Sequence, residues 1–212
     1  MHLCDTSVYA NYLCHANWKA EGTQRCKEAK SQRCFGLPVC REGKEFEQKA
    51  MNNLSTTISQ GFAHYFQDFR QRVEELSNDL SEEEFWSNPY PYGTSIGNLV
   101  LHLTGNLSYY IGTQLAGSGY VRNREEEFDS IAHPGKAETL AKLEEAVNLV
   151  LSTLATQSDA DWSSAYSAVG VDDVHDRFSI FLRCAVHFHH HIGQMGYTRD
   201  ELIRKRRLDQ SR

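Results

Sequence analysis

Four long stretches of the chain place apolar residues three and four positions apart, which is the spacing of one helix face. They cover about residues 54–77, 95–116, 136–156 and 177–208. Residues that stop helices separate them, including Pro89, Pro91 and the segment Gly117–Gly119. One connection, Tyr120 to Gly135, is long and polar. Four long helices with one long crossover predict an all-α, four-helix bundle.

Local signals add detail to the connections. Ser81 followed by Glu84 fits a capping box, which predicts a short helix at this point. The loop of residues 157–176 is expected to hold a short hairpin around Gly170. The acidic runs Glu82–Glu84 and Glu125–Glu127 are interpreted as solvated charges.

Composition narrows the class of protein. Of 212 residues, 40% are hydrophobic and 24% are charged, as in folded soluble domains. A net charge of −6 argues against a nucleic-acid partner, and we interpret the basic run Arg204–Arg207 as favourable charge at a helix C-terminus. No run of 18 apolar residues and no signal peptide are present, so we expect a cytoplasmic protein without a membrane partner.

The first 50 residues differ from the rest. Five of the six cysteines lie there, namely Cys4, Cys14, Cys26, Cys34 and Cys40. Their irregular spacing does not favour a zinc module, and a disulfide framework would need an oxidising compartment. Met51 resembles a natural start before the first helix. Our hypothesis is that residues 1–50 are a poorly structured or non-native extension, from an upstream reading of the gene, and that residues 51–212 form the domain.

The segment His187–His191 holds four histidines in five residues, inside the last expected helix. Residues four apart share a helix face, so His187 and His191 can bind one ion together. The apolar stripe of this helix, at about 100° per residue, centres on Phe181, Ala185, Phe188 and Ile192. His187 and His191 then share one flank, His189 lies on the other, and His190 points toward solvent. This pattern favours His187 and His191 as the metal-binding pair.

A third ligand is available on the helix expected at residues 95–116. His102 lies at the edge of the apolar stripe of that helix, one turn before Asn106. Three histidines leave coordination positions open, which is typical of a reactive metal site rather than a closed structural one. The alternative for His102 is a partly buried histidine that is hydrogen-bonded to a neighbour.

The other candidate residues have structural interpretations. His64, His133 and His175 lack a partner at a useful spacing and are expected on the surface. Cys184, one turn before His187, is interpreted as a small buried thiol, with a place near the metal as the alternative. The sequence has no phosphate-binding glycine loop, no G-x-S-x-G motif and no C-x-x-C motif. The histidines therefore carry the chemistry that the sequence shows.

Two motifs resemble those of the DinB-like superfamily, which includes the YfiT-type proteins. Residues 95–106, SIGNLVLHLTGN, resemble its first metal motif, and residues 187–194 resemble its second, H-x3-H-x-G-Q. The resemblance covers about residues 51–208 and implies a bundle in up-down-down-up order. It implies one divalent ion, zinc or nickel, on His102, His187 and His191, and a homodimer. Several members are metal-dependent transferases that use a low-molecular-weight thiol such as bacillithiol, mycothiol or glutathione.

Two functions remain open at this point. The first is an enzyme for detoxification or stress response, in which the ion activates a thiol or water against a small-molecule substrate. Asn106 and Gln194 would then orient the imidazoles by hydrogen bonds. The second is a non-catalytic metal-binding or interaction module, in which the ion joins two helices.

Overall fold

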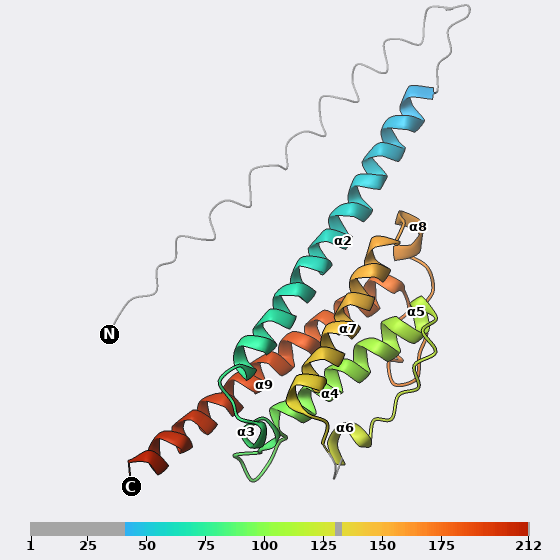
Figure 1. The fold of residues 1–212 in the computed structure, drawn as a ribbon. Coiled ribbons are helices and arrows are strands. Elements are labelled where there is room, and N and C mark those ends of the chain that lie inside the picture. The colour runs from blue at the N-terminus through green and yellow to red at the C-terminus, as the bar shows by residue number, and fades with distance from the viewer. Residues whose placement is uncertain (1–40, 130–132, 212) are drawn as a thin grey trace, which may run out of the picture. The chain divides into compact units, whose positions relative to one another are not determined.

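The computed structural model describes residues 41–129 and 133–211, which are mostly helical (Figure 1). The four long helices are α2 (Arg41–Ser77), α4 (Ile96–Leu107), α7 (Lys136–Ala155) and α9 (Arg177–Gln210). The α4 helix continues through a π-helical segment, η2 (Ser108–Thr113), into α5 (Gln114–Ala116). The connections hold the short helices α3 (Glu82–Trp86), α6 (Glu126–Asp129) and α8 (Asp159–Trp162). The prediction of an all-α bundle is confirmed.

The long helices follow one another in the order that the resemblance implied. From residue 46 on, α2 runs down the bundle as drawn in Figure 1, α4 and α7 both run up, and α9 returns downward. Because α4 and α7 are parallel, the chain between them must travel back along the bundle. This crossover joins residue 117 to residue 135, and its α6 helix packs against α4.

The helix bounds agree with the sequence prediction except at the first helix. α2 begins at Arg41, whereas the apolar pattern predicted a start at residue 54. That prediction was wrong because residues 41–50 are rich in Glu, Lys and Gln, which favour helix without producing an apolar stripe. The chain divides into two compact units, Met1–Glu45 and Phe46–Arg212, so the boundary expected at residue 50 falls within α2. The interpretation of Cys4, Cys14, Cys26, Cys34 and Cys40 concerns residues outside the part of the chain that the structure describes.

The apolar stripes meet in the centre of the bundle. Each long helix contributes fully buried side chains: Phe66 and Val73 from α2, Leu103 and Leu107 from α4, Leu143 and Val147 from α7, and Phe181 and Phe188 from α9. Burying a large apolar side chain contributes about 1.5–3 kcal/mol, so this core fixes how each helix is rotated. The stripe predicted for α9 is buried as expected, and its phase decides which histidines face inward.

Polar contacts fix both ends of the bundle. At one end, Ser55 in α2 donates its backbone N–H to Asp159 Oδ1 at 3.0 Å, and Trp162 Nε1 donates to Ser55 Oγ at 2.9 Å. At the other end, Ser81 and Glu84 form the expected capping box of α3. In the loop before α9, the expected hairpin is reduced to one antiparallel bridge between Ala165 and Asp176.

Among the described helices, none combines the length and apolar content needed to cross a membrane.

Candidate metal centre

The positions of the three histidines follow from how α4 and α9 begin. Ser95 Oγ accepts the backbone N–H of Asn98 at 3.1 Å and so caps α4, and Asp176 caps α9 in the same way. Two turns into α4, the side chain of His102 is buried and 6% exposed. His187 and His191 are one turn apart on α9, on the flank beside the buried stripe. Packing of α4 against α9 brings the two sets together.

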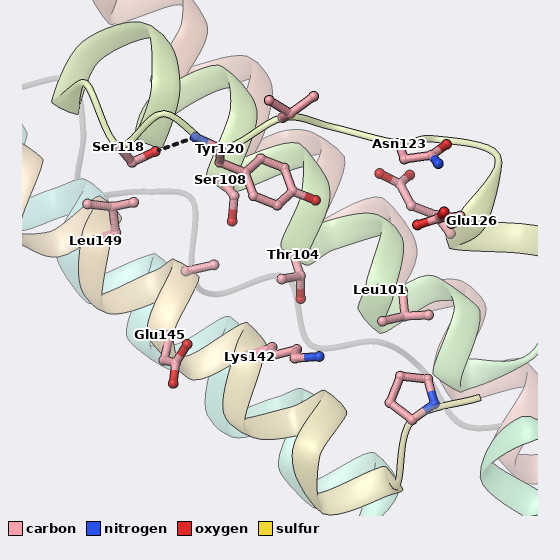
Figure 2. A pocket seen from close by; sticks show the side chains of 14 residues that line it. Leu101, Thr104, Ser108, Ser118, Tyr120, Asn123, Glu126, Lys142, Glu145 and Leu149 are labelled. Atoms are coloured by element: carbon pink, nitrogen blue, oxygen red, sulfur yellow. Dashed lines mark hydrogen bonds between the residues drawn. The ribbon is translucent and has the colours of Figure 1, made fainter. Parts of the chain in front are cut away.

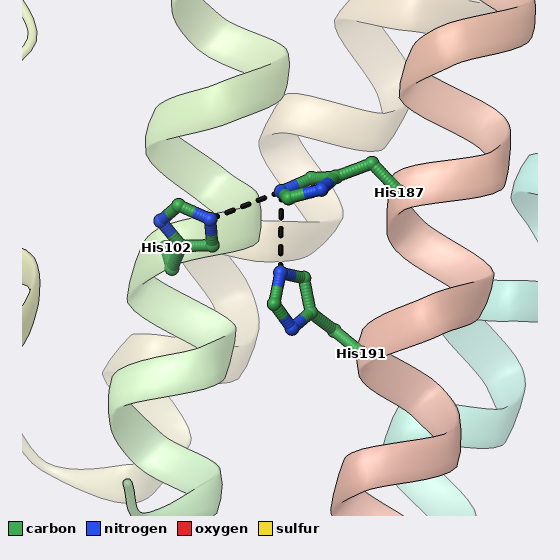
Figure 3. A group of neighbouring side chains, drawn as sticks. All are labelled: His102, His187 and His191. Atoms are coloured by element: carbon green, nitrogen blue, oxygen red, sulfur yellow. Dashed lines mark hydrogen bonds between the residues drawn. The ribbon is translucent and has the colours of Figure 1, made fainter. Parts of the chain in front are cut away.

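The three rings converge on one point between α4 and α9, as Figure 3 shows. His187 Nε2 lies 3.0 Å from His102 Nε2 and 3.2 Å from His191 Nε2. One ligand nitrogen from each ring lies within 4.8 Å of the other two. Nitrogens that bind one zinc ion at about 2.0–2.1 Å in a tetrahedron lie roughly 3.3 Å apart. The observed spacing therefore fits a single ion.

Outer hydrogen bonds orient two of the rings. His102 Nδ1 lies 2.7 Å from Glu127 Oε2, and His191 Nδ1 lies 2.7 Å from Gln194 Oε1. A carboxylate and an amide oxygen accept hydrogen bonds, so both Nδ1 atoms carry the proton and both Nε2 atoms present lone pairs inward. Lone pairs that face one another repel unless a cation or a proton lies between them. The donor set therefore fits a divalent metal ion.

Glu127 was expected in a solvated acidic run, and that interpretation was wrong. Its side chain is buried and 5% exposed, because α6 packs against α4 and places it behind His102. Arg122 donates to both oxygens, from Nε to Oε1 at 2.7 Å and from Nη2 to Oε2 at 2.9 Å. Asn98 Nδ2 donates to the backbone carbonyl of Glu127 at 2.9 Å. The carboxylate is thus paired and fixed, as a buried charge must be.

The electrostatics of the centre favour neutral imidazoles. Burial alone would raise the pKa of Glu127, but hydrogen bonds from His102 and Arg122 outweigh it and hold the pKa below its ordinary value. Burial, followed by the neighbouring His191, lowers the pKa of His187 to about 3. Burial also lowers the pKa of His191, although the hydrogen bond to Gln194 opposes the shift. A neutral imidazole is the form that binds a metal.

These pKa shifts predict how stability depends on pH. In the metal-free protein, His187 stays neutral down to about pH 3, whereas an unfolded histidine takes up a proton near pH 6.5. The unfolded state therefore binds more protons between these values. We expect the free energy of unfolding to hold above pH 6.5 and to fall as the pH drops toward 3. Urea unfolding of metal-free protein at a series of pH values would measure this.

Replacing His187 isolates its contribution to the slope of the free energy of unfolding against pH. His187→Leu should flatten the loss of stability between pH 6.5 and 4, and His175→Leu, at an exposed site, should leave it unchanged. Equal slopes in wild type and His187→Leu would contradict the assignment.

Gly105 makes room for Glu127. A Cβ atom built at Gly105, on α4, would overlap Glu127 Oε1. We expect Gly105→Ala to push the carboxylate off His102 and to cost about 1–3 kcal/mol of stability, as overpacking does. Gly61→Ala is the matched control, because a Cβ there meets nothing within 4 Å and should stabilise the exposed α2 helix by about 0.5–1 kcal/mol. Thermal unfolding of both variants tests this, and a stable Gly105→Ala would refute it.

A cavity opens beside the histidines. This histidine cavity has a volume of about 800 Å³, and its walls include His102, His187 and the η2 residues Tyr109 and Tyr110. The volume is in the range of sites for small organic ligands. Cys184 also lines it but is only 2% exposed, and burial raises the pKa of its thiol to about 12. The thiol is therefore protonated at neutral pH and is a poor nucleophile.

A second cavity, of about 730 Å³, lies between α4, α7 and the crossover (Figure 2). None of the three histidines lines it. Its charged groups have mixed sign: Lys142, Glu126 and Glu145 are exposed, and Glu127, which also lines it, is buried and paired with Arg122 and His102. This lining selects no particular ligand, so we place the chemistry in the histidine cavity.

The structure gives the remaining candidates different positions. Gln194 contacts His191, as described above, whereas Asn106 lines the histidine cavity and its Oδ1 is buried without a hydrogen-bond partner. His64, His133, His175, His189 and His190 are exposed, which confirms the surface prediction for the first three. Glu127 and Arg122 were not among the site residues predicted from the sequence. Their signal was an acidic and a basic residue in the long crossover, which spacing alone cannot assign to His102.

Fold and site together define a class: a helical bundle whose interior carries a three-histidine cluster that can hold a metal ion. The sequence matches the DinB superfamily over residues 65–195, and the chain belongs to that superfamily. None of the curated proteins with which it was compared matches it. A crystal structure described as the conserved protein of a locus from Enterococcus faecalis has a similar fold. It superposes with a TM-score of 0.57 at 18% identity, over 68% of this chain and 96% of that one.

Proposed function

We propose that this protein binds one divalent metal ion through His102, His187 and His191 and uses it as an enzyme. The observation that carries the proposal is the convergence of three Nε2 atoms beside a cavity of about 800 Å³. A closed structural site would need no such cavity. Membership of the DinB superfamily supports the same conclusion.

The reaction we propose is transfer of a low-molecular-weight thiol, or of water, to an electrophile. A divalent ion lowers the pKa of a thiol or of water in an open coordination position and so supplies a nucleophile at neutral pH. The residues of this chain orient the proposed ligands and provide the space for the reactants. Glu127 and Gln194 hold the rings of His102 and His191, and the cavity beside the rings gives the electrophile room to approach. In thiol transfer, the sulfur forms a bond to carbon while the leaving group departs with its electron pair.

The test combines metal analysis with turnover. Full-length protein without a histidine tag should contain about one equivalent of zinc, nickel or a similar ion, and His102→Ala should contain far less. The loaded protein is then mixed with 1-chloro-2,4-dinitrobenzene and a panel of thiols, and chloride release is followed. Metal-dependent turnover that His102→Ala loses is the expected result.

Failure of turnover with metal still bound would leave the non-catalytic alternative. In that case the ion would raise the melting temperature by linkage, and His102→Ala would lower stability without any activity to lose. Absence of bound metal in the wild type would reject both forms of the proposal.

A further inference from the structure

The charge lining the histidine cavity has one sign. Three arginines line it, Arg122 and Arg124 from the crossover and Arg183 from α9. No Asp or Glu is among its lining residues within the described chain. The whole chain carries a net charge of −6, so a lining with only cationic charge is unexpected for this protein. A cavity lined by one sign of charge concentrates ligands of the opposite sign.

Two of these arginines keep their charge available to a ligand. Arg122 donates two hydrogen bonds to the Glu127 carboxylate, from Nε and Nη2, so that pair is close to neutral. Arg183 is 3.7 Å from Asp173, whose side chain is 71% exposed, and such exposed pairs are weak. The guanidinium of Arg124 lies 6.0 Å from the centre of the Phe128 ring. Arg124 and Arg183 are therefore the groups that can bind an acid group.

The uncharged residues that line the cavity suit the aromatic or aliphatic part of a small ligand. Tyr109, Tyr110 and Tyr120, with Val121 and Val169, supply aromatic and aliphatic surface in a volume of about 800 Å³. This lining favours a ligand with an aromatic or aliphatic body.

We propose that the histidine cavity binds a small organic anion whose acid group is held by Arg124 and Arg183 and whose aromatic or aliphatic body packs against the tyrosines. As a statement of substrate class, this rests on the proposed function. The binding itself depends on the protein's own arginines and does not require the metal.

The test compares two fluorinated probes of nearly equal shape, 4-fluorophenylacetate and its neutral amide, by ¹⁹F NMR titration. Full-length protein is used in metal-loaded and metal-free form. We expect the carboxylate to bind at least about tenfold more tightly than the amide in both forms, because an ionic hydrogen bond contributes about 1.5–3 kcal/mol. The measurement on metal-free protein excludes the explanation that the carboxylate binds by coordinating the ion.

Matched variants test whether Arg124 and Arg183 cause the preference for the carboxylate over the amide. Arg124→Gln with Arg183→Gln should reduce the preference to less than about threefold, while Arg72→Gln with Arg207→Gln, exposed and outside the cavity lining, should retain it. Of these four residues, Arg124 and Arg183 line the cavity and Arg72 and Arg207 do not, and circular dichroism checks the folding of each variant. Equal binding of both probes, no binding of either at 10 mM (about 3 kcal/mol of affinity), or a preference that survives loss of Arg124 and Arg183 would overturn the proposal. If the protein takes up no metal when metal is supplied but still prefers the carboxylate, the proposed metal function is rejected and the anion proposal stands.

Discussion

Replacing His187 with alanine is expected to weaken binding of a divalent metal ion by at least about 100-fold. Structural zinc sites bind with about 10–16 kcal/mol of apparent free energy, so one of four ligands accounts for roughly 3 kcal/mol, which is more than 100-fold in Kd. His187 is the central ring of the cluster, within 3.2 Å of both other Nε2 atoms. Its loss leaves two nitrogens that no longer enclose a site.

His190→Ala is the matched control, because His190 lies on the same helix and is exposed. Competition titration with a chromogenic zinc chelator would measure Kd for wild type and both variants. Wild-type affinity in His190→Ala with a large loss in His187→Ala is the expected pair of results. If the two variants bind zinc equally well, the site lies elsewhere in the chain.

Glu127→Gln is expected to reduce metal affinity by about 10–100-fold without removing any proposed ligand. Partners that orient a ligating histidine have effects of this size. A glutamine oxygen in the place of Oε2 can still accept from His102 Nδ1 and Arg122 Nη2, but it carries no full negative charge, and the NH2 group in the place of Oε1 cannot accept from Arg122 Nε. Breaking the pair also leaves Arg122, whose side chain is 11% exposed, without its counter-charge, at about 3 kcal/mol of stability.

Two further variants distinguish an effect of Glu127 on the orientation of His102 from an effect of Glu127 on the stability of the fold. Glu126→Gln removes the same charge from the neighbouring exposed position and should change neither quantity. Glu127→Gln combined with Arg122→Met removes the unpaired cation, so it should recover stability while metal affinity stays low. Recovery of metal affinity along with stability would show that Glu127 acts only through folding. Calorimetric melting and the chelator titration are measured on the same samples.

The ion pair between Arg122 and Glu127 links the crossover to the metal centre. The two residues are five positions apart, on the segment that passes beside α4, and together they fix one face of His102. The same segment contributes Arg124 and Tyr120 to the wall of the histidine cavity. A change in the crossover would therefore alter both the orientation of the His102 ring and the lining of the histidine cavity.

The sequence by itself determined the helices and the inward phase of the histidines. Apolar spacing predicted the continuous α4–η2–α5 segment and the helices α7 and α9 to within a few residues, because burial of a stripe fixes both the extent and the rotation of a helix. The same stripe on α9 placed His187 and His191 on one flank and His190 in solvent, as the structure has them.

Only the tertiary structure decided what surrounds those histidines. Glu127 and Arg122 lie in the crossover, which has no period, so their burial depends on how α6 packs against α4. Asn106 has the right spacing to reach a ring one turn away, yet its Oδ1 has no partner, because side-chain direction depends on the rotation of neighbouring helices. The physical reason is general: periodicity reports which face of an element is buried, whereas a polar network is set by distances between elements that the local sequence does not encode.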